Sequence, residues 1–99
     1  MIMKAILITY NQAYYDEIAA TLNNNGVKCI TELNEIKGQG SNTGEPHYGT
    51  HAWPTLNNAI ISIVPDEAVE GILKQLKEKD LKAPDLGLRA FYWNVEGMI

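Results

Sequence analysis

Two short apolar runs, each followed by a helical stripe, constrain the fold of this 99-residue chain more than any other feature. The first run, Ile2–Tyr10, is rich in β-branched and long aliphatic residues, which is typical of a β-strand. Over positions 12–24 apolar residues then recur every four positions, as on one face of an amphipathic helix: Tyr14, Ile18 and Leu22. Asn11 is a suitable N-cap for this helix, and Gly26 can adopt the left-handed conformation that ends it.

The second half of the chain repeats this pattern. Val27–Ile36 is expected to form a second strand and Leu56–Val64 a third. Pro65 cannot continue a strand ladder but fits the first turn of a helix, which is expected to run to about Lys79. An aromatic fourth strand, Arg89–Val95, follows. The order β-α-β-β-α-β predicts a ferredoxin-like α+β sandwich, with a four-stranded antiparallel sheet and two helices on one face.

Length and charge narrow the class of protein. The chain is long enough for one core only, so residues 1–99 are expected to form a single domain. Its 12 acidic and 8 basic residues give a net charge of -4, which argues against a nucleic-acid partner. The first apolar run is too short for a signal peptide or a membrane span, so we expect a cytoplasmic protein without membrane insertion. The single cysteine, Cys29, is expected to be a buried structural thiol.

Both faces of the expected sheet carry apolar residues, although two helices can cover only one of them. Ile6 and Ile8 point to one face of the first strand, whereas Ala5 and Leu7 point to the other. The chain has no spare segment for a third layer, so we expect the second face to be buried against other copies of the chain. Each isoleucine-sized side chain covered in this way contributes about 1.5–3 kcal/mol. The sequence therefore predicts a homo-oligomer that assembles through its sheets.

A long glycine-rich segment, Lys37–Thr55, separates the second and third strands. Neighbouring strands are normally joined by a few residues, so a connection of this length is usually a working part of the protein or disordered. The segment contains both histidines of the chain and Trp53, and its proline at position 54 is expected to lead the chain back into the fold. Any account of function has to explain this segment.

Two kinds of chemistry are open for the loop. The corner from Lys37 to Gly40 could hold a phosphate or carboxylate with main-chain N–H groups, or it could be a flexible hinge. Glu45, His47 and His51 could together bind a divalent metal such as zinc, copper or nickel, with equivalent residues from neighbouring chains. The glycines and proline around them oppose a helix, so the alternative is that both histidines are solvated loop residues.

The chain resembles the nitrogen regulatory PII family and its PII-like relatives along nearly its whole length. The resemblance lies in the order of three segments: MKAILITYNQAYYDEIAATLNNNGV, EIKGQG and NNAIISIVPDEAVEGILKQLKE. The second segment is similar to the Glu-Val-Lys-Gly-x-Gly run that opens the mobile T-loop of the family. The resemblance implies a homotrimer of ferredoxin-like subunits that binds small effectors, commonly adenine nucleotides, in clefts between subunits. It also implies a signalling role, in which the T-loop reports the bound state to a protein partner such as a transporter or enzyme.

The chain departs from this family in two places. The glycine-aspartate-glycine-lysine run of the family's B-loop is present only as Asp85-Leu86-Gly87-Leu88-Arg89-Ala90-Phe91, and the sequence given stops at VEGMI, where typical members continue into a tail with phosphate-contacting arginines. Both departures argue against nucleotide binding in the usual manner. The residues expected to contact a ligand are Lys37, Gly38, Gln39, Gly40, Gly87 and Arg89.

The sequence indicates a regulatory binding protein rather than an enzyme. No nucleophile, base and orienting partner are expected to converge, so we expect no catalytic residues. The main hypothesis is a PII-like trimer in which a small effector, an adenine nucleotide or another anion, changes the Lys37–Thr55 loop and its docking to a protein partner. The alternative is a metal-responsive trimer of CutA-like design that uses Glu45, His47 and His51. The sequence names neither the cofactor nor the partner.

Overall fold

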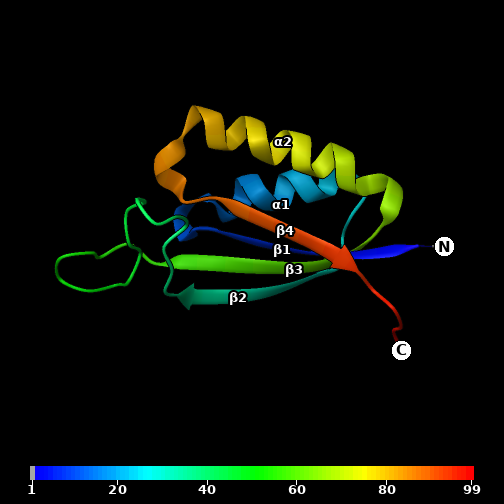
Figure 1. The fold of residues 1–99 in the computed structure, drawn as a ribbon, viewed down its shortest axis with the longest axis horizontal. Helices are drawn as coiled ribbons and strands as arrows, with labels where there is room; N and C mark the ends of the chain where they lie inside the picture. Colours follow the sequence, from blue (N-terminus) through cyan, green and yellow to red (C-terminus); the bar gives the residue numbers. More distant parts are fainter. Residues whose placement is uncertain (1) are drawn as a thin grey trace.

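The computed structural model describes residues 2–99, apart from the side chain of Leu86. Its helices and strands are β1 (Met3–Asn11), α1 (Tyr15–Asn24), β2 (Ile30–Ile36), β3 (Asn57–Pro65), α2 (Val69–Lys82) and β4 (Arg89–Asn94). The strands form one antiparallel sheet in the order β2-β3-β1-β4, and both helices lie on the same side of it (Figure 1). This arrangement confirms the predicted ferredoxin-like fold. No helix in residues 2–99 is both long and apolar enough to cross a bilayer.

Local sequence signals explain where the elements begin and end. The Asn11 side chain accepts a hydrogen bond of 3.0 Å from the Ala13 N–H and so caps the 3₁₀ turn that leads into α1. Gly26 has a φ of 76°, as expected for the residue that ends this helix. Short 3₁₀ turns also precede α2 (Asp66–Ala68) and β4 (Pro84–Leu86).

Several boundaries and one burial prediction were wrong. The strands β1 and β3 begin and end one residue later than predicted, and β4 ends at Asn94 rather than Val95. The second strand begins at Ile30 rather than Val27, because the Val27 N–H closes the end of α1 with a 3.0 Å bond to the Leu22 carbonyl. The second helix continues past Lys79 to Lys82. Cys29 lies in the extended stretch before β2 and is exposed, so it is not the buried thiol that the sequence predicted.

The hydrophobic core lies between the helices and one face of the sheet. The largest fully buried side chains of β1 and β3 include Ile6, Ile8 and Ile60. The helices contribute Ile18 and Leu22 from α1, together with three residues of α2: Val69, Ile72 and Leu76. Because both helices pack on this face, no helix of residues 2–99 covers the other face of the sheet (Figure 1).

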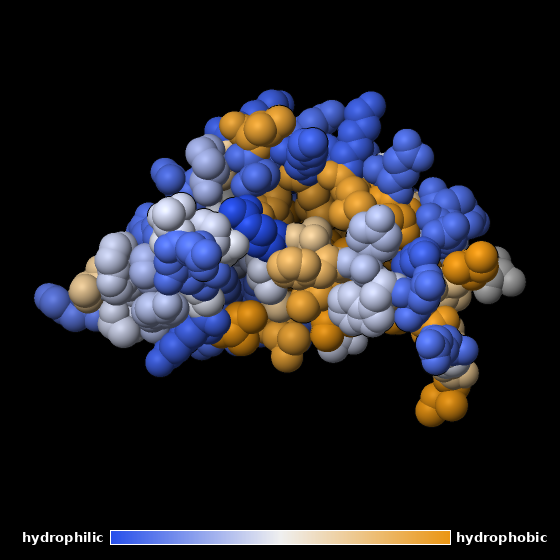
Figure 2. All heavy atoms as spheres, viewed as in Figure 1, coloured by the Kyte–Doolittle hydropathy of each residue, from blue (hydrophilic) through white to orange (hydrophobic). Residues whose placement is uncertain are grey.

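The helix-free face of the sheet is apolar. Strand register places Leu7 directly opposite both Phe91 and Ile61, and residues opposite one another in a sheet point to the same face. The same rule adds Ala5, Ile63 and Trp93 to this face. The two aromatic side chains remain 55% and 49% exposed. Figure 2 shows apolar side chains reaching the surface along the lower side of the molecule, beneath the strands. We refer to this surface as the open face.

Candidate functional site

The residues predicted to contact a ligand come from two distant parts of the chain and meet at one end of the sheet. The Lys37–Gly40 corner leaves β2, Gly87 lies in the connection between α2 and β4, and Arg89 is the first residue of β4. Both connections lie at the end of the molecule opposite to the termini (Figure 1). The Arg89 Nε donates a 2.8 Å hydrogen bond to the Gly40 carbonyl, so the beginning of the long loop is tied directly to the start of β4.

Close packing of main chain explains two of the glycines in this corner. A Cβ atom on Gly40 would lie 2.9 Å from the Gly87 carbonyl oxygen, which is closer than real Cβ contacts allow. Gly87 has a φ of 62°, in the left-handed region that favours glycine. A Cβ atom on Gly87 would also lie 3.3 Å from the His47 Cε1. The loop and the α2–β4 connection are therefore fitted against each other without an intervening side chain.

His47 belongs to a buried stem at the base of the loop. Its main chain pairs with Gly38 through two hydrogen bonds, of 3.0 and 2.7 Å. Its side chain is 3% exposed, and its Nδ1 lies 2.6 Å from the Asn57 Oδ1. The Asn57 amide also lies so close to Gly38 that a Cβ atom there would be 2.8 Å from its Nδ2. His47 is thus a packed residue of the loop stem. Its partner Asn57 could not be predicted, because an asparagine in a strand carries no local signal for a contact with a loop side chain.

The remaining residues of the corner lie nearer to solvent. Lys37 is exposed. The Gln39 amide donates a 2.9 Å hydrogen bond to the Gly44 carbonyl and accepts one of 3.1 Å from the Tyr48 hydroxyl. Gln39 therefore stabilises the shape of the loop between positions 39 and 48.

The three residues predicted as metal ligands are not brought together within one chain. Glu45 and His51 are exposed, whereas His47 is buried against Asn57. Among residues 2–99 no group of three histidine, cysteine or acidic side chains is placed to hold a metal ion. The metal hypothesis stays a prediction, and it now requires ligands from neighbouring chains.

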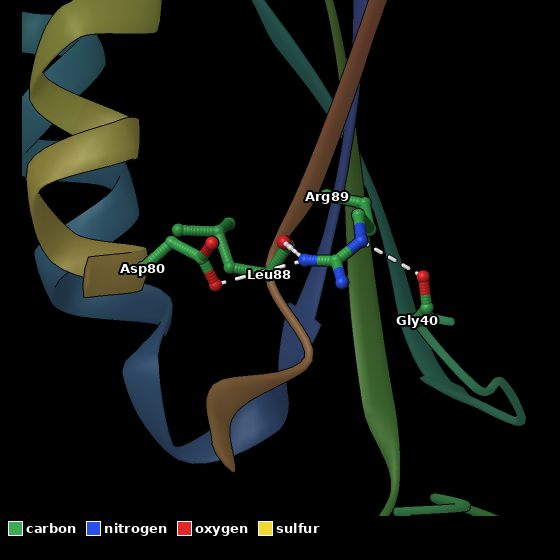
Figure 3. Close-up of polar contacts among 4 residues, drawn as sticks. All are labelled: Gly40, Asp80, Leu88 and Arg89. Atoms are coloured by element: carbon green, nitrogen blue, oxygen red, sulfur yellow. Dashed lines mark hydrogen bonds and ion pairs between the residues drawn. The ribbon is translucent and has the colours of Figure 1, made fainter. Parts of the chain in front are cut away.

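Arg89 is the cation at the centre of the corner. Its Nη1 donates a 2.6 Å hydrogen bond to the Leu88 carbonyl and lies 3.6 Å from a carboxylate oxygen of Asp80 (Figure 3). A small hollow of about 140 Å³ adjoins this guanidinium. It is lined by Gly40, Ser41, Thr43, Gly44, Glu45, Pro84, Asp85, Gly87 and Arg89. A guanidinium beside glycine main chain suits a carboxylate or phosphate group. The sequence contained no local signal for the part played by Asp80.

Buried polar groups shape the end of β2 from which the loop departs. Glu35 has a φ of 56° where the register of β2 and β3 shifts, and its N–H donates a 3.0 Å hydrogen bond to the Asn58 side chain. Next to this bulge, the Tyr10 hydroxyl is buried and has no hydrogen-bond partner of normal geometry among residues 2–99. Burial raises the pKa of Tyr10 to about 12; the Glu32 carboxylate adds to this shift, and the Asn58 amide opposes it.

Known structures share this fold. The apo form of CPII, a nitrogen regulatory PII-like protein from Thiomonas intermedia K12, superposes with a TM-score of 0.74 at 19% identity, over 96% of this chain and 90% of that chain. The same protein bound to ADP, AMP and bicarbonate gives a TM-score of 0.77 at 20% identity, over 96% and 87%. The B. subtilis GlnK–ATP complex gives 0.71 at 15% identity, over 99% and 85%.

No family model and no curated protein matches the chain. The comparisons therefore confirm the PII-like resemblance at the level of the fold: the chain has the fold of PII-like proteins over nearly its whole length.

Proposed function

We propose that this chain is a divergent PII-like regulatory protein that binds a small anionic effector at the base of its long loop. The proposal depends on one observation, the hydrogen bond of 2.8 Å between Arg89 and the Gly40 carbonyl. This bond joins the cation best placed to hold an anion to the first residues of the loop. An effector that contacts Arg89 would therefore act directly on the position of residues 37–55.

We further propose that the protein is a homotrimer assembled through its open face. Phe91 and Trp93 on that face are about half exposed in the single chain, and exposed apolar patches of this kind mark interaction surfaces. In such a trimer the effector would lie in clefts between subunits. The loop, in which Trp53 is 41% exposed, would contact a protein partner such as a transporter or an enzyme.

The proposed effector is an adenine nucleotide or another small anion. CPII has been solved with ADP, AMP and bicarbonate, and GlnK with ATP, all on the same fold. The corner of this chain offers one guanidinium and glycine main chain, which suit a phosphate or a carboxylate. The proposal includes no catalytic step. The proposed function of the protein is regulation through binding.

Thermal-shift and calorimetric titrations with ATP, ADP, AMP and bicarbonate test this function. A ligand present at 100 times its dissociation constant stabilises the folded state by about 2.7 kcal/mol. We expect this shift for at least one of these anions in the wild type and its loss in Arg89→Gln. Lys74→Gln is the matched control, because Lys74 is exposed on α2, carries the same charge and lines neither hollow beside Arg89. An equal loss in both variants, or no binding at all, would refute the proposed function.

The same two assays, repeated with zinc, copper and nickel, decide the metal-responsive alternative. Stabilisation by zinc, copper or nickel, with no response to the anions, would favour the CutA-like hypothesis. His51→Ala and Glu45→Gln are the appropriate variants because both side chains are exposed and their loss should leave the fold intact. His47 is less suitable, since it is buried in the loop stem.

A further inference from the structure

Asp80 is the carboxylate that contacts Arg89 from α2. It lies in the last turns of this helix, and its oxygen is 3.6 Å from the Arg89 Nη1. The side chains of Asp80 and Arg89 are 36% and 38% exposed, respectively. An ion pair of this length and exposure is weak, because water and salt screen it. Another anion can therefore replace Asp80 at little cost.

The rest of the Arg89 guanidinium is held in place by main chain. Its Nε and Nη1 donate to the carbonyls of Gly40 and Leu88 (Figure 3). Within the described residues these bonds leave Nη2 for a further acceptor. The guanidinium thus keeps its position whether or not Asp80 is present, which is the property that a preorganised anion site requires.

Arg89 also separates two hollows at this end of the molecule. On one side is the hollow of about 140 Å³ beside Gly40 and Gly87. On the other is a groove of about 270 Å³ between α2 and β4, lined by Leu73, Leu76, Lys77, Asp80, Leu88, Arg89 and Ala90. Arg89 is the one described residue common to both linings. Asp80 lines only the groove between α2 and β4, so an anion that reaches the guanidinium through this groove meets the Asp80 carboxylate.

We propose that Asp80 is an internal competitor for the effector: its carboxylate occupies Arg89 in the free protein and is displaced when the phosphate or carboxylate of the effector binds. This inference rests on the proposed function, because it concerns the same guanidinium. Two carboxylate-like groups on one guanidinium repel each other, and Asp80 is exposed enough to turn into solvent. Displacement also releases the last turns of α2 from the base of the loop, since Arg89 is the link between Asp80 and Gly40.

The test compares Asp80→Asn with Glu78→Gln in calorimetric titrations with ADP and AMP. Both substitutions remove one negative charge from the same helix and keep the size of the side chain. Glu78 lines a different groove, between the two helices. We expect Asp80→Asn to bind the anion about fivefold more tightly than the wild type and Glu78→Gln less than twofold more tightly. We also expect Asp80→Asn to restore no binding in an Arg89→Gln background, because the effector and Asp80 both act on the same guanidinium.

The outcomes separate the two proposals. If the wild type binds ADP or AMP but both single variants gain equally, the effect is only that of net charge, and the role of Asp80 is refuted while the proposed function stands. If Asp80→Asn weakens binding, Asp80 is part of the ligand site rather than a competitor, which also refutes it. If neither the wild type nor the variants bind an anion, the proposed function fails. Melting temperatures of all variants show whether a change in affinity follows from lost stability.

Discussion

Removal of the aromatic side chains of the open face should dissociate the proposed trimer without unfolding the subunit. Phe91 and Trp93 lie side by side on this face, separated by one residue of β4, and Tyr92 between them points to the helix side because it lies opposite Ile6. All three are about half exposed, at 55%, 49% and 51%. Phe91→Thr/Trp93→Thr is therefore the perturbation, and Tyr92→Thr is its control on the same strand.

The expected magnitude follows from the exposed area. A buried aromatic side chain covers 150–250 Å², so each half-exposed ring has about 100 Å² left to bury. At about 25 cal/mol per Å², covering one ring contributes about 2.5 kcal/mol, and the pair contributes about 5 kcal/mol per subunit. Since about 1.4 kcal/mol changes an equilibrium constant tenfold, the double substitution should weaken assembly by more than a thousandfold. Threonine keeps the β-propensity of the strand, so the subunit itself should stay folded.

Light scattering or sedimentation velocity at micromolar concentration measures the outcome. We expect a trimer for the wild type and for Tyr92→Thr, and a monomer with an unchanged far-ultraviolet circular dichroism spectrum for the double variant. A monomeric wild type would refute the assembly through the open face. A double variant that stays trimeric would show that the subunits meet elsewhere. Dissociation by Tyr92→Thr as well would mean that β4 is generally sensitive and that the open face has no special part.

Three further predictions concern single residues. Gly87→Ala should lower the free energy of unfolding by about 1–2 kcal/mol, because alanine is strained at a φ of 62° and its Cβ would press on His47. Chemical denaturation measures this loss, and an unchanged midpoint would contradict the packing. Glu35→Gly should raise that free energy by up to about 1 kcal/mol, since Glu35 holds a φ of 56°. Burial raises the pKa of Tyr10 to about 12, so the unfolded state ionises first and the wild type should lose stability as the pH rises from about 10 to about 12. In melting curves over this range, Tyr10→Phe should lose less stability than the wild type, and parallel losses would contradict the cause given for the shift.

The order of the elements could be predicted because several boundaries carry a local signal. Asn11 caps the first helical turn and Gly26 ends α1, as the sequence indicates. Pro65 was predicted in the first turn of a helix, but it is the last residue of β3, paired with Met3, and it precedes that turn. The exposed state of Cys29 could not be predicted in the same way. Val27 uses its main chain to close α1, so β2 begins later, and the cysteine lies before the strand instead of within it.

The candidate site was predictable only in part. The sequence predicted Gly40 as a ligand contact from the main-chain freedom of the glycine corner, and Gly87 and Arg89 through a family resemblance. The structure places the three together, and their contact with a ligand stays a prediction. The sequence contained no indication of the contacts that organise them. Gly40 and Arg89 are 49 positions apart, and the roles of Asp80 and Asn57 depend on long-range packing that no periodicity or capping rule encodes.

The preformed stem of the long loop lowers the free energy that a small ligand must supply to change the conformation of the loop. Two bridges, between Gly38 and His47 and between Tyr48 and Leu56, divide the loop into a lobe of residues 39–46 beside Arg89 and a lobe of residues 49–55 that carries Trp53. Ordering a free chain costs about 1–2 kcal/mol per residue, so ordering the whole loop would absorb more free energy than a small ligand supplies. Because the stem is already formed, the proposed effector at Arg89 would only have to shift the first lobe, and His47, whose main chain bonds to Gly38, would link this shift to the second lobe. Hydrogen exchange should therefore show protection by the effector first at residues 39–46, and protection confined to residues 49–55 would contradict this coupling.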